Sequence, residues 1–181
     1  MNKQIAVFCG SSMGFNPIFQ ASAKEVGRKL VTQKFDLVYG GGSIGLMGVI
    51  ADEVLSLNGQ VTGVITEKLH ALEIAHQGLT QLHIVKTMHE RKALMAQLSD
   101  AFIALPGGIG TLEEITEIIT LLQLDYHQKP CGILNVSGYY DAFITYLDQM
   151  VTQGFLDTKS RNLIIIESNI NYLLAKMSIN N

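Results

Sequence analysis

The 181-residue sequence has no tryptophan, three prolines and only two cysteines. The neighbours of Cys9 and Cys131 place both in or beside predicted strands, where a free thiol behaves as a small apolar side chain. The five histidines show no spacing typical of metal ligands, either with one another or with the cysteines. We therefore expect reduced, structural cysteines and no metal site.

A strong charge of one sign is also absent, and so is a long apolar run. The 13 basic residues oppose 16 acidic ones, and no basic run could follow a phosphate backbone or an anionic membrane. The first ten residues, MNKQIAVFCG, contain an apolar run that is too short for a signal sequence or a membrane span. These absences predict a cytoplasmic protein that binds neither nucleic acid nor membranes.

What is present is an alternation of short apolar runs with longer segments of helical period. The runs are QIAVFC, DLVYG, VTGVIT, LHIV, AFIAL, CGILNV and LIII, and the helices are expected over 17–33, 45–58, 87–98, 111–125, 139–153 and 169–178. This alternation predicts a parallel sheet covered on both faces. Because no linker or repeat divides the chain, we expect one Rossmann-like, doubly wound α/β domain over residues 1–181.

Segment 66–80 shows no obvious helix or strand and follows the third predicted strand. In doubly wound folds the ligand lies outside the carboxyl ends of the strands, where the strand-to-helix loops open. Segment 66–80 is therefore expected to border the site.

Two glycine clusters each join a predicted strand to a helix. The first glycine loop is YGGGSIGLMG (39–48), and the second is PGGIGT (106–111). Glycine permits close backbone approach, and the N–H groups at the start of the following helix attract phosphate. Two such loops predict a nucleotide-sized ligand, with its phosphate bound by Gly41, Gly42, Gly107, Gly108, Gly110 and Thr111. The loop CGSSMG (9–14) could face the same ligand or be only a tight turn.

The first loop also reads as GxGxxG through Gly40, Gly42 and Gly45, followed by Glu67. This pattern resembles a dinucleotide fingerprint, but a single match is weak. The short chain has no second domain to hold a hydride acceptor, so we expect no nicotinamide chemistry and no cofactor.

Thr111 and Glu114 have the spacing of a capping box, which would explain the glutamate without any chemistry. The alternative is catalytic, because a carboxylate beside a phosphate-binding turn can stabilise the oxocarbenium-like transition state of ribose C1–N cleavage. In that case N–H groups at the helix start should lower the pKa of Glu114 and keep it ionised. The adjacent Glu113 is expected to serve only as a partner of the helix dipole.

Arg91 and Lys92 lie about one turn into the predicted helix 87–98. An arginine fork suits phosphate or a purine edge, and lysine supplies a simpler charge. Spacing alone favours the plainer interpretation, a solvated basic pair.

Five stretches, VFCGSS, YGGGSIGLMG, MHERKA, SDAFIALPGGIGTLEE and KPCGILNVSGYYD, together resemble the LOG family, the cytokinin riboside 5'-monophosphate phosphoribohydrolases. The resemblance spans residues 5–156, and the order of its MxxRK-like and PGGxGTxxE motifs is highly specific. It implies hydrolysis of AMP or N6-modified AMP to the free base and ribose 5-phosphate. It also implies that Arg91 and Glu114 are the catalytic pair. The implied substrate-binding residues are Glu73, Lys92, Gly108, Ile109, Gly110, Thr111, Leu112, Glu113 and Thr120.

The chain departs from many family members at Leu121, where they carry tryptophan, and this leaves the base preference open. Relatives are also labelled lysine decarboxylases, but no lysine here has a setting typical of a pyridoxal phosphate Schiff base. The alternative function is a non-catalytic carrier of a nucleotide or of molybdenum cofactor, because such carriers have similar glycine loops.

The predicted helix 111–125 is apolar nearly all round. Burial in the core alone could explain this pattern. We favour a homodimer in which this helix and helix 87–98 pack against their symmetry mates, as the resemblance implies.

Overall fold

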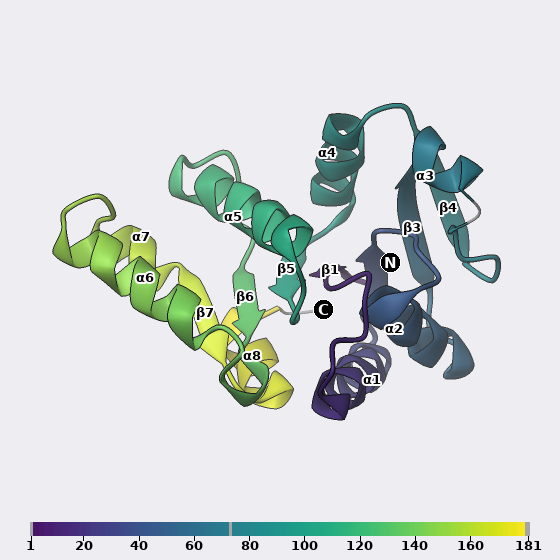
Figure 1. Cartoon of the computed structure of the whole chain (residues 1–181), viewed down its shortest axis with the longest axis horizontal. Coiled ribbons are helices and arrows are strands. Elements are labelled where there is room, and N and C mark those ends of the chain that lie inside the picture. The colour runs from purple at the N-terminus through teal and green to yellow at the C-terminus, as the bar shows by residue number, and fades with distance from the viewer. Residues whose placement is uncertain (1, 73, 180–181) are drawn as a thin grey trace.

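The computed structural model describes residues 2–72 and 74–179. Its strands form one parallel sheet in the order β4-β3-β2-β1-β5-β6-β7 (Figure 1). Their bounds are β1 (Gln4–Phe8), β2 (Asp36–Tyr39), β3 (Val61–Thr66), β4 (Gln81–Val85), β5 (Ala101–Ala104), β6 (Cys131–Leu134) and β7 (Ile164–Glu167). The predicted parallel α/β architecture is confirmed.

Helices cover both faces of this sheet. They are α1 (Pro17–Thr32), α2 (Gly45–Ser56), α3 (Glu67–Ala71), α4 (Met88–Leu98), α5 (Ile109–Gln123), α6 (Asp141–Thr152), α7 (Thr158–Asn162) and α8 (Ile170–Met177), with a 3-10 turn η1 (Val136–Gly138). In Figure 1, α1 and α8 lie below the sheet and α4 and α5 lie above it. The core is therefore divided into two layers.

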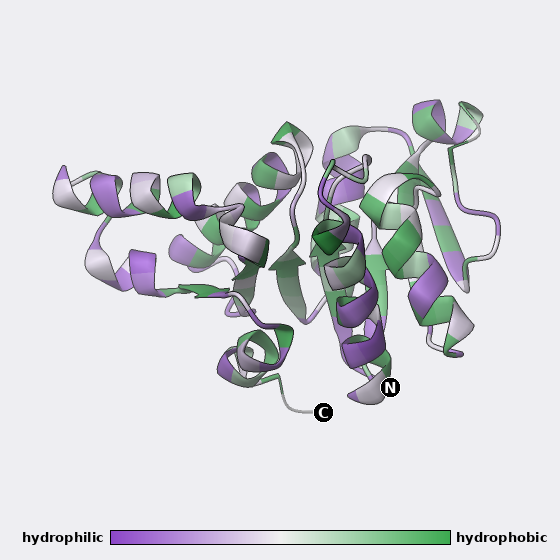
Figure 2. Cartoon of the chain, turned by 60° about the horizontal axis from the view of Figure 1, so that its bottom comes forward, coloured by the Kyte–Doolittle hydropathy of each residue, from purple (hydrophilic) through white to green (hydrophobic). Residues whose placement is uncertain are grey.

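The alternation of side chains along the strands produces these two layers. Ile5 and Val7 of β1 pack with α1, α2 and α8, whereas Ala6 and Phe8 pack with α4, α5 and α6. Figure 2 shows the central strands in green and the helices banded green and purple, as expected for helices with one buried side. The central strands are mostly apolar because both of their faces are covered, whereas the edge strand β4 carries Gln81 and His83 and is partly exposed.

The carboxyl ends of β1 and β5 mark the place where the chain changes direction across the sheet. These two strands are paired, with Phe8 opposite Ala104, yet the helix that follows β1 packs on one face and the helix that follows β5 on the other. The two loops diverge and leave a crevice between them, which is where such folds bind ligands.

The structure differs from the predicted elements in three places. Helix α5 begins at Ile109 with Gly108 as its N-cap, so Thr111 lies inside the helix, and of the two alternatives for Glu114 the capping box is wrong. The short helices α3 and α7 were not predicted, because five-residue helices carry too little periodicity.

In the described part of the chain, no helix has both the length and the apolar character needed to cross a membrane.

Candidate active site

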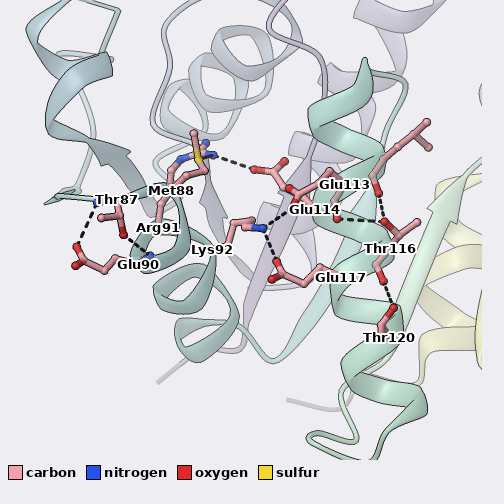
Figure 3. Close-up of polar contacts among 11 residues, drawn as sticks. Thr87, Met88, Glu90, Arg91, Lys92, Glu113, Glu114, Thr116, Glu117 and Thr120 are labelled. Atoms are coloured by element: carbon pink, nitrogen blue, oxygen red, sulfur yellow. Dashed lines mark hydrogen bonds and ion pairs between the residues drawn. The ribbon is translucent and has the colours of Figure 1, made fainter.

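Arg91 of α4 and Glu114 of α5 form a buried ion pair at the carboxyl edge of the sheet. Nη1 of Arg91 donates to Oε1 of Glu114 at 2.9 Å, and the two side chains are only 9% and 13% exposed (Figure 3). The prediction of a solvated basic pair is therefore wrong for Arg91. Burial of such a pair is costly unless further hydrogen bonds satisfy both charges.

Main-chain carbonyls supply those further bonds for Arg91. Nε donates to the oxygen of Val64 at 2.9 Å, and Nη2 donates to the oxygen of Gly40 at 3.1 Å. Nη1 also lies 3.5 Å from the sulfur of Met88. Arginine has five N–H donors, so these contacts leave one N–H of Nη2 for a ligand. Most of the guanidinium is therefore held by the protein itself, and Nη1 alone contacts Glu114.

Gly40 is the reason that Arg91 fits at this depth. A Cβ atom at Gly40 would lie 2.1 Å from Nη2 of Arg91. This glycine of the first loop therefore makes room for a guanidinium and not for a ligand.

Burial sets the protonation of the two acidic groups at the bottom of the site. Burial raises the pKa of Glu114, and Arg91 opposes this shift only in part. The expected lowering by helix N–H groups is therefore wrong in direction. Burial, helped by the charge of Glu114, also raises the pKa of the Cys9 thiol far above its ordinary value. Cys9 remains a protonated, structural thiol, as predicted.

Lys92 does not face the same space as its neighbour Arg91. Its ammonium pairs with Glu113 and, at 3.1 Å, with Glu117 of α5 (Figure 3). The hydrogen bond to Glu113 raises the pKa of Lys92. Glu113 thus has a side-chain partner on α4, beyond its predicted part in the helix dipole.

The second glycine loop leaves the start of α5 open. No side chain caps Gly108, whereas Asn16, Thr66 and Thr87 cap α1, α3 and α4. The first N–H groups of a helix have no partner within it, so those of Ile109, Gly110 and Thr111 remain for a ligand. A cavity of about 310 Å³ joins this helix start to Arg91 and Glu114.

The glycines of the second loop serve two different purposes. A Cβ atom at Gly107 would lie 2.1 Å from Oγ1 of Thr111, so Gly107 is required for packing. At Gly108 and Gly110 a Cβ atom would meet nothing within 4 Å. These two exposed glycines border the cavity, and a side chain there would occupy ligand space.

Gly41 and Gly42 of the first loop are buried beneath segment 74–76. The N–H of His76 donates to the oxygen of Gly41 at 2.9 Å, and Gly42 forms an isolated bridge with Ala75. Gly41 has a φ of 76°, and packing surrounds both residues. This placement does not favour a direct contact with phosphate.

The serine loop (9–14) is the part of the site that sequence reasoning left undecided. Ser11 lines the Arg91–Glu114 cavity and also a second cavity of about 260 Å³, whose wall includes Ser12, Phe19 and Tyr139. The two cavities share Gly10, Ser11 and Gly108. Two features of the sequence could have identified this loop as part of the site: its position after a central strand and its two serines.

The remaining predicted site residues do not all border the cavity. Leu69 lines the cavity, so segment 66–80 borders the candidate site as predicted from the sequence. Leu112 packs against the core from the side of α5, and Thr120 is exposed, with its hydroxyl donating to the Thr116 carbonyl at 2.8 Å. Figure 3 shows Thr120 well down α5 from Glu114. Glu73 lies outside the residues that the structure describes.

Comparison with known proteins decides the family. A family model described as "Possible lysine decarboxylase" matches residues 47–177. Two Arabidopsis thaliana proteins, the cytokinin riboside 5'-monophosphate phosphoribohydrolases LOG7 and LOG1, are 46% and 47% identical to the chain over 175 residues. The match covers 97% of this chain and 81% and 82% of theirs. The chain belongs to the LOG family. The resemblance predicted from its motifs is confirmed.

Solved structures share the fold of this LOG-family chain. The molybdenum cofactor binding protein of Rippkaea orientalis has a TM-score of 0.73 at 19% identity, covering 98% of this chain and 96% of its own. The Moco carrier protein of Chlamydomonas reinhardtii has a TM-score of 0.69 at 20% identity, covering 97% and 99%. At such identities the likeness concerns the fold alone.

The decarboxylase description of the family model finds no support in the site. Among the residues that the structure describes, no lysine lines the Arg91–Glu114 cavity, and Lys92 is held by two carboxylates. A pyridoxal phosphate enzyme needs a lysine that can form a Schiff base in its cavity. The LOG-family site is built around an arginine and a carboxylate instead.

Proposed function

We propose that the chain hydrolyses the N-glycosidic bond of adenine nucleoside 5'-monophosphates, AMP or N6-modified AMP, to the free base and ribose 5-phosphate. The observation that carries this proposal is a buried Arg91–Glu114 pair in the wall of the cavity that opens on the uncapped start of α5. At one end of that cavity the free N–H groups of α5 suit an anion, and at the other end the carboxylate of Glu114 suits a positive charge. Membership of the LOG family supports the same substrate class.

The phosphate is assigned to the N–H groups of Ile109, Gly110 and Thr111. Glu114 follows Gly110 by four residues, about 6 Å along the helix axis. That spacing suits a ribose whose phosphate lies at the helix start and whose C1' lies near the carboxylate. The open Cβ positions of Gly108 and Gly110 allow the ligand to approach the backbone closely.

Glu114 is assigned to the reacting carbon. As the bond from C1' to the base nitrogen breaks, positive charge develops on the ribose, and an ionised carboxylate stabilises it. The oxygen of a water molecule bonds to C1', and the proton that the water loses balances the one that the departing base takes up. Arg91 fixes the carboxylate through Nη1, and its remaining N–H can reach the substrate.

The experiment is an assay for free base with AMP and with isopentenyl-adenine nucleotide. Wild-type protein should release base, and Glu114→Gln should release none while its melting temperature stays within a few degrees. Glu25→Gln, at an exposed site on α1, is the matched control and should behave as wild type. Phosphate-dependent binding without base release would instead favour a carrier of a nucleotide or of molybdenum cofactor.

We also propose a cytoplasmic homodimer whose protomer is one domain, 1–181. The two free, buried cysteines support a reducing compartment. Exposed apolar side chains near the ends of α4 and α5, those of Met88, Leu124 and Tyr126, support a contact with a second copy. Light scattering at micromolar concentration should give twice the chain mass, and a monomer there would refute this assembly.

A further inference from the structure

Segment 74–76, which follows α3, pairs with the first glycine loop as a short antiparallel strand would. The N–H of Ser43 donates to the oxygen of Ile74 at 2.9 Å, and the N–H of His76 donates to the oxygen of Gly41 at 2.9 Å. These two bonds flank an isolated antiparallel bridge. The Ser43 hydroxyl also donates to the Ile74 oxygen, at 3.2 Å. The segment is therefore held to the loop by its main chain.

The side chain of His76 connects this segment to α2. Only 13% of that side chain is exposed, and its Nδ1 accepts the N–H of Gly78 at 3.0 Å. A ring nitrogen that accepts has no hydrogen of its own, so the hydrogen of the neutral imidazole is on Nε2. Nε2 lies 3.0 Å from Oδ1 of Asp52 on α2 and donates to it. The imidazole thus joins the segment to the helix that begins where the first loop ends.

The first loop and the chain before segment 74–76 both contribute to the candidate active site. Nη2 of Arg91 donates to the oxygen of Gly40 in this loop at 3.1 Å. Leu69 of α3, five residues before the segment, lines the Arg91–Glu114 cavity. Neither His76 nor Asp52 is among the described residues that line this cavity. Their contact can act on the site only through the segment and the loop.

We infer that His76 and Asp52 hold segment 74–76 on the first glycine loop and are positioning residues for substrate binding. Through the segment they keep the Gly40 carbonyl and the Leu69 side chain in place. This inference rests on the proposed function. If the contact is lost, the segment is paired with the loop in only a fraction of the molecules, and the apparent affinity for substrate falls by that fraction.

The base-release assay tests this role through the separation of KM from kcat. Asp52→Ala should raise KM for AMP about fivefold, because fewer molecules hold the segment in place. The kcat should stay within about twofold of wild type, because saturating substrate selects the molecules in which the segment is paired. His76→Ala loses the bond to Gly78 as well and should raise KM about tenfold.

Two conservative variants separate the bonds of the imidazole. An asparagine side chain accepts from the N–H two residues further on, so His76→Asn keeps the turn at Gly78 but does not reach Asp52. It should therefore behave as Asp52→Ala does. Asp52→Asn keeps an oxygen that accepts from Nε2 and should restore KM to within about twofold of wild type.

Arg28→Ala is the matched control for Asp52→Ala. Arg28 of α1 is 57% exposed, and its Nε donates to Glu53 of α2 at 2.7 Å. This variant removes a polar contact of the same helix that connects it to α1 and not to segment 74–76. Its KM and kcat should equal those of wild type. Because both contacts have an exposed partner, both variants should melt within about 4 °C of wild type.

Amide hydrogen exchange measures the pairing of the segment without any substrate. The amides of Ser43 and His76 are bonded only while the segment lies on the loop, so in Asp52→Ala both should exchange about fivefold faster. The amide of Leu105 is the reference. It donates to the oxygen of Phe8 at 2.9 Å in the centre of the sheet and should exchange as in wild type.

Two kinetic results would refute the positioning role. One is a wild-type KM for both Asp52→Ala and His76→Ala. The other is a lowered melting temperature with an unchanged KM, which is what a purely structural contact gives. Unchanged exchange at Ser43 and His76 in Asp52→Ala would show that the contact does not hold the segment. If wild-type protein releases no base, the proposed function fails, and the exchange measurement still decides whether the contact holds segment 74–76.

Discussion

The first and second glycine loops occupy equivalent places after strands of one sheet, yet their glycines do different things. In the first loop Gly40 makes room for Arg91, and Gly41 and Gly42 are covered by segment 74–76. In the second loop Gly108 and Gly110 have open space beside them at the start of an uncapped helix. Only the second loop can offer its backbone to a ligand.

This difference separates two causes for a glycine-rich sequence. A glycine can be required because protein atoms occupy the place of a side chain, or because a ligand does. In the first case a Cβ atom added at the glycine would lie in close contact with protein atoms. In the second case it would lie in open space. The two loops can therefore be told apart by single alanine substitutions that differ in the sign of their effect on stability.

The largest effect is expected for Gly40→Ala. The new methyl group would displace the Arg91 guanidinium, and a displacement of about 1 Å at a catalytic group costs on the order of 100-fold in rate. Loss of the buried hydrogen bonds should also lower the melting temperature by about 5 °C. Base-release rates and thermal melts test both effects. Wild-type turnover in this variant would show that the position of Arg91 does not matter.

The pH dependence of rate and stability should depend on both loops. The first loop positions Arg91, and the helix after the second loop carries Glu114. Burial raises the pKa of Glu114 above its ordinary value of 4.5, so kcat/KM should fall on acidification with a midpoint above 4.5. The folded state then binds this proton more tightly than the unfolded chain. The stability contributed by Glu114 is present below pH 4.5 and is lost as pH rises through the folded pKa.

Rate profiles and urea unfolding as a function of pH check these two trends. Glu114→Gln is the control, since its stability should lack the same pH-dependent component. An acidic limb at or below the ordinary value would mean that helix N–H groups outweigh burial.

Gly110→Ala should have the opposite effect on stability from Gly40→Ala. It adds a methyl group in open space within a helix, which should stabilise the fold by about 0.5 kcal/mol or more. KM for AMP should nevertheless rise about tenfold, because the methyl group enters the volume assigned to phosphate. Gly107→Ala is the contrast within the same loop and should lower the melting temperature. An unchanged KM for Gly110→Ala would remove the second loop from the phosphate site.

The smallest effect is expected for Tyr139→Phe. The Tyr139 hydroxyl donates to the oxygen of Gly107 at 2.6 Å and braces the second loop from outside. Because the ring is half-exposed, loss of this bond should cost about 0.5 kcal/mol and lower the melting temperature by about 2 °C. Tyr172→Phe, on the exposed side of α8, is the control and should melt as wild type. A larger change in rate than in stability would make Tyr139 part of the site.

Several features could be predicted because they depend on neighbours in sequence. Apolar runs of four to six residues between amphipathic segments predicted the strands, and both predicted faces of the sheet are covered by helices. The cap of α5 was misplaced by a few residues, because Thr111 and Glu114 have the spacing of a capping box. A true capping box exists at Thr87 and Glu90 of α4, where spacing and helix start coincide.

Contacts between distant residues could not be predicted in the same way. The sequence assigned Glu113 to the helix dipole and singled out Glu114, but spacing could not show that Arg91 would pair with Glu114 and Lys92 with Glu113. In the structure Arg91 lines the cavity, whereas Lys92 lines a separate narrow gap between α4 and α5. The burial that raises the pKa of Glu114 also comes from packing between elements.

The amino-acid sequence by itself determined the parallel α/β class, the family and the two glycine-rich turns, because these are local patterns of apolar period and backbone freedom. Only the tertiary structure decided which glycines face a ligand and which carboxylate meets the buried arginine. The physical reason is that strand order places α4 beside α5 over the crevice between β1 and β5. Charge partners and open space arise there from residues more than 20 positions apart.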